Sequence, residues 1–121
     1  MKKPFSLQNA FDAWQERVLD DAVRVFGRIH QQDKLIEEMA ELTQAVLKMR
    51  EYIGRDVYLH RRTLTIGEIA DVYITLRQLV KMLDCEDELS NVIAYKLNYL
   101  VAETRKEAER KYGHDKTEHT V

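Results

Sequence analysis

The sequence predicts an all-α protein, a bundle of four helices, and two observations lead to that class. Apolar residues recur with a period near 3.6 along most of the chain, which is the spacing of amphipathic helices. Only one proline and four glycines occur among the 121 residues, so few positions interrupt a helix. A chain of this length with 45% apolar residues can bury one core, and we expect a single domain over residues 1–121.

Each expected helix is identified by its own apolar stripe. Roughly five residues at the N-terminus and roughly eight at the polar C-terminus are expected to fray. In chain order, the predicted helices run from Ser6 to Phe26 with Phe11, Trp14, Val18, Ala22 and Val25 inward; from Asp33 to Tyr52 with Leu35, Met39, Leu42 and Val46 inward; from Ile66 to Leu83 with Ile69, Val72, Leu76, Leu79 and Leu83 inward; and from Glu86 to Lys111 with Leu89, Ile93, Leu97 and Leu100 inward.

A basic loop is expected between the second and third helices, over residues 54–65 (GRDVYLHRRTLT). It contains Arg55, His60, Arg61 and Arg62 within a short connection. Such a loop is most simply a solvated surface segment. Beside carboxylate-rich helices it can also bind an anion, because guanidinium groups match phosphate and carboxylate geometry.

Composition excludes several classes of protein. Nineteen basic and twenty-one acidic residues give a net charge near −2, which does not indicate a nucleic-acid partner. Cys85 is the single cysteine, so neither an intrachain disulfide nor a cysteine-rich zinc site is possible. No apolar stretch approaches the ~20 residues of a membrane span, and no signal peptide is recognisable. We therefore expect a cytoplasmic protein without a membrane partner.

Two pairs of acidic residues border the apolar stripes of neighbouring helices. Glu38 and Glu41 are three residues apart on the second helix, as are Glu68 and Asp71 on the third, so each pair shares one helix face. If these helices pack antiparallel, the two edges meet. Four converging carboxylates repel one another and raise their pKa values, which a divalent cation relieves. Oxygen ligands favour a hard ion, Mg²⁺ or alternatively Mn²⁺.

Simpler interpretations exist for each half of this arrangement. The segment from Thr65 to Glu68 fits a capping box, in which Glu68 only closes the start of the third helix. The acidic residues of the second helix also fit a solvated face, with Glu41 reaching Lys48. Taken together, the two halves favour a metal site. A di-iron bundle needs Glu-x-x-His pairs, and none of the four histidines has a glutamate three residues before it.

Lys96 interrupts the inward stripe of the fourth helix. It lies seven residues after Leu89 and three after Ile93. Lysine is rarely buried without a partner. Either its ammonium group extends to solvent at the end of the bundle, or it points toward the carboxylates and a phosphate bound there.

The order Glu37-Glu38-x-x-Glu41 followed by Glu68-x-x-Asp71 resembles the EExxE…ExxD motif of the MazG-like all-α nucleoside triphosphate pyrophosphohydrolases. The similarity extends over about residues 30–105. The resemblance implies that Glu38, Glu41, Glu68 and Asp71 bind Mg²⁺, while Glu37 or Glu41 orients or deprotonates water. Lys96 looks like the lysine that these enzymes often carry on the last helix.

The activity implied by this resemblance is Mg²⁺-dependent hydrolysis of a nucleoside or deoxynucleoside triphosphate to the monophosphate and pyrophosphate. The resemblance also implies a homo-oligomer, a dimer or a tetramer. Arg61 and Arg62 are assigned to the substrate phosphates from their charge alone. The alternative is a non-catalytic helical module that keeps the fold and acts through binding.

Overall fold

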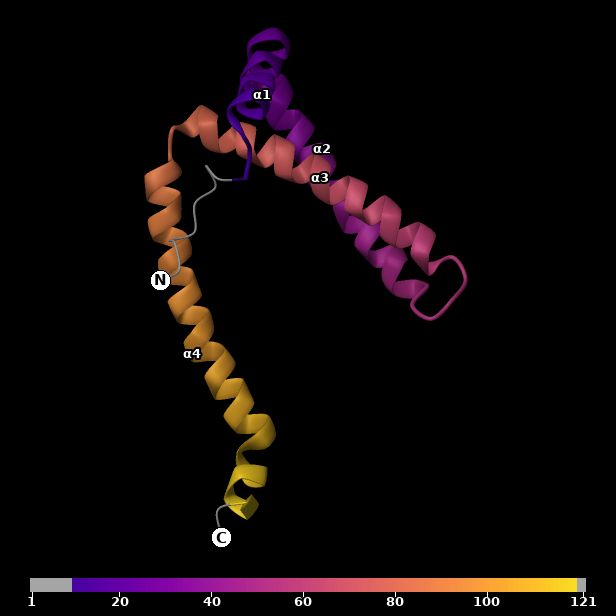
Figure 1. Cartoon of the computed structure of the whole chain (residues 1–121), viewed down its shortest axis with the longest axis vertical. Coiled ribbons are helices and arrows are strands. Elements are labelled where there is room, and N and C mark those ends of the chain that lie inside the picture. Colours follow the sequence, from indigo (N-terminus) through magenta and orange to yellow (C-terminus); the bar gives the residue numbers. More distant parts are fainter. Residues whose placement is uncertain (1–9, 120–121) are drawn as a thin grey trace. The chain divides into compact units, whose positions relative to one another are not determined.

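The computed structural model describes the backbone of residues 10–119 and the side chains of residues 10–113. It contains four helices, α1 (Ala13–Phe26), α2 (Arg28–Glu51), α3 (Tyr58–Leu83) and α4 (Glu86–His119), and no strand within that stretch (Figure 1). The all-α class with four helices is therefore confirmed. None of the helices in the described part of the chain combines the length and apolar character needed to cross a bilayer.

The helices fall into two compact units. Leu7–Cys85 contains α1, α2 and α3, and the second unit contains α4. Packing of α4 onto the other three helices, which a bundle requires, stays a prediction. Helix α4 continues to His119, beyond the expected end at Lys111. The expected fraying concerns residues 1–5 and 114–121, which lie outside the stretch with described side chains.

An antiparallel hairpin of α2 and α3 dominates the first unit (Figure 1). The two helices are joined by residues 52–57, where Gly54 has a φ of +80°, a conformation that favours glycine. The hydroxyl of Thr65 on α3 donates a hydrogen bond to the carbonyl of Ala45 on α2, at 3.4 Å. The antiparallel pairing places the acidic edges of both helices opposite each other.

The third helix begins earlier than the sequence predicts, at Tyr58 and not at Ile66. Most of the expected basic loop is thus the first two turns of α3. Residues 58–65 contain neither proline nor glycine. The hydroxyls of Thr63 and Thr65 donate to the backbone carbonyls four residues earlier, those of Leu59 and Arg61. This bonding is compatible with a helix interior. Thr65 consequently lies inside a helix, and the proposed capping box of Thr65 and Glu68 is wrong.

The starts of α1 and α2 also differ from the prediction. Helix α1 begins at Ala13 because Asp12 caps it: the Asp12 carboxylate accepts from the Gln15 backbone N–H at 2.8 Å, and the Gln15 side-chain oxygen accepts from the Asp12 N–H at 2.9 Å. The predicted start at Ser6 lies outside the described residues. Gly27, with a φ of +99°, separates α1 from α2. Helix α2 starts directly after it, at Arg28 instead of Asp33.

Polar contacts join α1 to α3. The Arg77 guanidinium on α3 donates to the Glu16 carboxylate at 2.6 Å, and the Lys81 ammonium lies 3.1 Å from Glu16 and 2.7 Å from Asp20. The buried amide of Gln78 donates to the Leu19 carbonyl at 3.1 Å and accepts from Gln31 at 2.9 Å. These contacts fix α1 and the first turns of α2 against the C-terminal half of α3.

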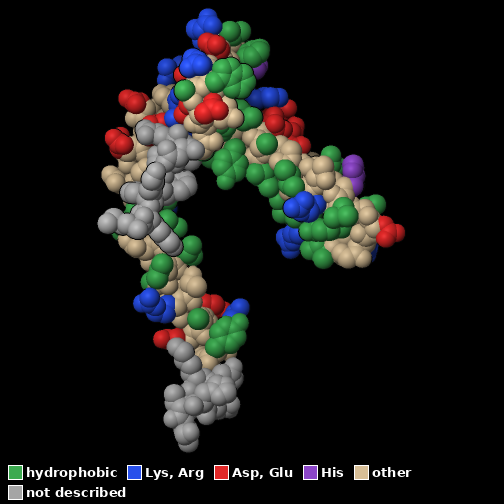
Figure 2. Space-filling model, viewed as in Figure 1, with side chains coloured by type: hydrophobic (Ala, Val, Ile, Leu, Met, Phe, Trp, Pro, Cys, Tyr) green, Lys and Arg blue, Asp and Glu red, His purple; other side chains and the backbone are tan. Residues whose placement is uncertain are grey.

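The apolar core is small. Among residues 10–113, Leu19, Leu35 and Val80 are the buried hydrophobic residues. Several residues expected to face inward are exposed: Trp14, Val18, Val25, Met39, Ile69, Leu76, Leu83, Leu97 and Leu100. Figure 2 shows hydrophobic side chains exposed along the α2–α3 hairpin. The stripes correctly predicted helices, but the described units leave much of each stripe uncovered.

Candidate metal centre

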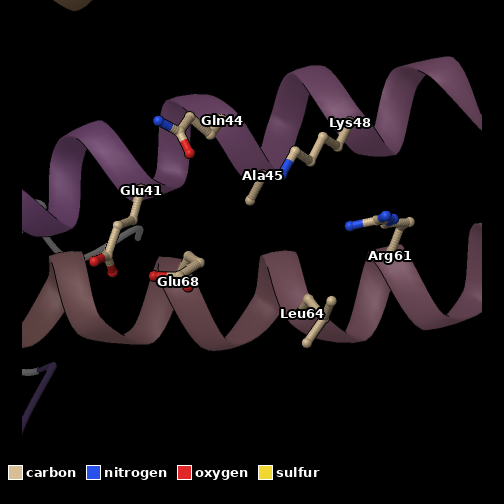
Figure 3. Close-up of a pocket in the computed structure, with 7 residues that line it drawn as sticks. All are labelled: Glu41, Gln44, Ala45, Lys48, Arg61, Leu64 and Glu68. Atoms are coloured by element: carbon tan, nitrogen blue, oxygen red, sulfur yellow. The ribbon is translucent and has the colours of Figure 1, made fainter.

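Three of the four predicted metal ligands meet between α2 and α3. Glu38 and Glu41 extend from α2 and Glu68 from α3, and each offers a carboxylate oxygen within 4.8 Å of the others. The spacing of three residues puts Glu38 and Glu41 on one face of α2, and the antiparallel hairpin brings Glu68 opposite them. In Figure 3, the side chains of Glu41 and Glu68 point toward each other across the gap between the helices.

Two oxygens of this cluster are buried without a hydrogen bond. Glu38 is only 6% exposed, and its Oε2 has no partner within the described structure. The Oε2 atom of Glu68 is likewise buried and has no hydrogen-bond partner there. A buried acceptor without a partner costs roughly 1–3 kcal/mol, and more when it is charged. A bound cation would satisfy both atoms, so the residues present fit a hard divalent metal.

Burial, followed by the charges of Asp71 and Glu41, raises the pKa of the Glu38 carboxyl. The ammonium group of Lys34 lies 3.5 Å from Glu38 and acts in the opposite direction. Lys34 is partly solvated, so its attraction is weakened and the pKa remains raised. The site is therefore electrostatically strained, with more negative charge than its own lysine neutralises.

Asp71 and Glu37 do not belong to the three mutually close acids. Asp71 is exposed and is not one of the three mutually close acids, although its charge acts on Glu38. Glu37 is 57% exposed in its side chain and lies 3.9 Å from Lys34. Glu37 thus has the solvated environment of the simpler interpretation, whereas the structure brings Glu38, Glu41 and Glu68 together.

A groove of about 190 Å³ runs from this cluster along the hairpin (Figure 3). Glu41 and Glu68 line one end, and Lys48 and Arg61 line the other. The surface between them is formed by Gln44, Ala45 and Leu64. Opposite charges at the two ends of one groove suit a metal ion together with an anion.

The remaining predicted site residues, apart from Arg61, do not line the groove. Arg62 is exposed and does not line the groove, whereas its neighbour Arg61 does. His60 and Arg55 are exposed near the hairpin turn. Lys96 is an exposed residue of α4, in the second unit.

Sequence reasoning missed Lys48 as a groove residue. The sequence suggests Lys48 only as an ion-pair partner of Glu41, yet no such ion pair forms among the described residues. The available signal was spacing, since Lys48 follows Glu41 by seven residues and Arg61 precedes Glu68 by seven. The two equal spacings of seven residues place these side chains on matching helix faces only if residues 58–65 are helical.

Comparisons with protein-family models, with curated proteins and with solved structures found no match to this chain.

Proposed function

We propose that the chain is a Mg²⁺-dependent nucleoside triphosphate pyrophosphohydrolase that releases a nucleoside monophosphate and pyrophosphate. The observation that carries this proposal is the buried acidic cluster, in which Glu38 and Glu68 each have a carboxylate oxygen without a hydrogen bond. Its residues are those of the motif that resembles the MazG-like enzymes. The adjacent cationic end of the groove adds a place for phosphate groups.

Each acidic residue has a proposed role. Glu38, Glu41 and Glu68 would hold Mg²⁺, with Asp71 completing the set from the next turn of α3. When bound, the metal neutralises the charge that develops on the phosphates during hydrolysis. Glu41 belongs to the cluster and is exposed, whereas Glu37 lies outside the cluster, so Glu41 is better placed to accept the proton of an attacking water. Lys96 is assigned to the phosphates only through the resemblance.

The size of the groove bears on how a nucleotide would bind. A volume of about 190 Å³ is below the roughly 300–1,000 Å³ of pockets that enclose drug-sized ligands. That space suits a hydrated metal and phosphate groups, but not a whole nucleotide. The nucleoside would then lie against a further surface, which another protomer can supply. We therefore propose a homo-oligomer, a dimer or a tetramer.

The second candidate function is a non-catalytic helical module that acts by binding a partner protein. The exposed apolar side chains of the hairpin favour it, including Ile36 and Leu59 at 67% and 71% exposure. Such a module has no need of a buried acidic cluster that destabilises its own fold. For this reason we place the enzyme first.

A screen of the common ribo- and deoxyribonucleoside triphosphates with Mg²⁺ tests the proposal. At least one substrate should yield monophosphate and pyrophosphate, and Glu41→Gln should lose this activity while remaining folded. The substitution keeps volume and removes a charge from a crowded site, so packing should survive. Orthophosphate as the first product, or full turnover by Glu41→Gln, would contradict the assignment.

A further inference from the structure

We propose that Lys48 and Arg61 form an anion subsite that holds the pyrophosphate part of the substrate and of the product. This inference rests on the proposed function for its direction, with the metal at the acidic end and the leaving group at the cationic end. The presence of the subsite itself follows from the geometry of the hairpin.

The spacing of the four charged groove residues is the same on both helices. Lys48 follows Glu41 by seven residues on α2, and Arg61 precedes Glu68 by seven on α3. Seven residues are two helical turns, or about 10.5 Å along the axis at 1.5 Å per residue. Because the helices are antiparallel, these opposite steps lead to the same end of the groove.

The two cations face the groove and lean toward its acidic end. In Figure 3, the Lys48 ammonium lies beside Ala45, and the Arg61 guanidinium points along the groove toward Glu68. Their long side chains shorten the distance between the two charged ends. A single phosphate at the acidic cluster would interact mainly with the metal, whereas a chain of phosphoryl groups can bridge both ends.

Within the part of the chain whose side chains are described, neither cation has a carboxylate partner. No ion pair of Lys48 or Arg61 forms among residues 10–113, although Lys34, Lys81 and Arg77 are all paired. Two positive groups across one groove repel each other, and an anion between them removes this repulsion. Guanidinium and ammonium groups are also the usual protein ligands of phosphate.

Tyr52 orients Arg61. The guanidinium carbon of Arg61 lies 5.3 Å from the centre of the Tyr52 ring, and that of Arg55 lies 5.9 Å from the same ring. Such contacts are favourable because the ring face is negative. Tyr52, at the end of α2, thus restricts Arg61 to the groove before any anion binds, and reduces the entropy lost on binding.

Calorimetric titration of the full chain with inorganic pyrophosphate in the presence of Mg²⁺ tests this inference. Lys48→Met and Arg61→Met should each weaken pyrophosphate binding about tenfold or more, because each removes a charge-assisted contact. Binding of Mg²⁺ alone should stay within about threefold of wild type, since neither residue touches the acidic cluster. Arg50→Met is the matched control, an exposed cation of α2 that does not line the groove, and should bind pyrophosphate as wild type does.

A second titration with inorganic phosphate separates a built subsite from general electrostatics. Phosphate binding should change little in either groove variant, because one phosphoryl group at the metal does not span the groove. Unchanged pyrophosphate binding by Lys48→Met and Arg61→Met would overturn the inference, as would an equal loss in Arg50→Met. If no nucleotide is hydrolysed but the pyrophosphate losses occur as expected, the subsite stands and the proposed enzyme activity falls.

Discussion

Glu38 is the residue on which the account of the metal centre depends most. Its carboxylate is 6% exposed, lacks a hydrogen bond at Oε2 and is surrounded by other acids. Glu38→Gln should raise the free energy of unfolding of the metal-free protein at neutral pH by about 1 kcal/mol, since it removes a buried charge without changing volume. Chemical denaturation measures this difference. A loss of stability would instead show that the charge is satisfied in the native protein.

The pH dependence of stability provides a second test of Glu38. Its folded-state pKa lies above the ordinary value of 4.5, so the folded state binds the proton more tightly than the unfolded state. This contribution to stability is fully present below about pH 4.5 and is lost as pH rises through the raised pKa. Unfolding curves from about pH 4 to about pH 8 should show this loss in wild type and not in Glu38→Gln.

Glu16 acts with the opposite sign and must be separated from Glu38. Burial alone would raise the pKa of Glu16, but hydrogen bonds from Arg77 and Lys81 lower it. Its contribution is present above the ordinary value of 4.5 and is lost as pH falls through the lowered pKa. Because both proteins share Glu16, the difference between wild type and Glu38→Gln isolates Glu38. A pH-independent difference would contradict the raised pKa.

At the level of the elements, α1 is held on α3 by a partly buried ion-pair network. Arg77 is 5% exposed and donates to Glu16 at 2.6 Å. Arg77→Met should destabilise the protein by about 3 kcal/mol, because Glu16 loses a close cation in a poorly solvated position. Arg24→Met is the control, since Arg24 pairs with Asp21 on the exposed face of α1 and should cost less than about 1 kcal/mol. An equal loss of stability in the two variants would show that the ion-pair network does not hold α1 on α3.

The sequence predicted the helices well and their beginnings poorly, for physical reasons. Periodicity identifies a helix through its buried face, so all four helices and the acidic edges of α2 and α3 were legible. Helix α3 begins at Tyr58 without a side-chain cap. Helix α2 begins at Arg28, directly after Gly27, which has an unusual backbone conformation and no side chain to cap the helix. Neither start has the side-chain pattern that marks a helix N-terminus.

The site was predictable to the extent that it depends on spacing within one helix. Glu38 and Glu41 needed only the rule that residues three apart share a face. The contribution of Lys48 and Arg61 depends on the register between two helices, including eight residues expected to form a loop. Asp71 does not join the cluster because of how the side chains pack, and the period of the apolar residues carries no information about that packing.

For the whole molecule, the exposed apolar surface predicts self-association. Three buried hydrophobic residues are few for the stretch 10–113, and large apolar side chains such as Ile36 remain exposed there. Light scattering should show a dimer or a tetramer, and Ile36→Glu should weaken association. Thr43→Glu, which adds the same charge at an exposed polar position of α2, is the control. A monomer at all concentrations would contradict the homo-oligomer.

Direct titration of metal binding tests most simply whether Glu38, Glu41 and Glu68 together form a divalent metal site, as we propose. Mn²⁺, followed by its paramagnetic resonance signal, should bind to the wild-type protein and be displaced by excess Mg²⁺. Glu38→Gln and Glu68→Gln should each reduce the affinity more than about tenfold, since each removes a ligand charge. Glu37→Gln, adjacent in sequence but outside the cluster, should bind nearly as wild type does. Equal affinity in all four proteins, or no binding by the wild type, would contradict the claim.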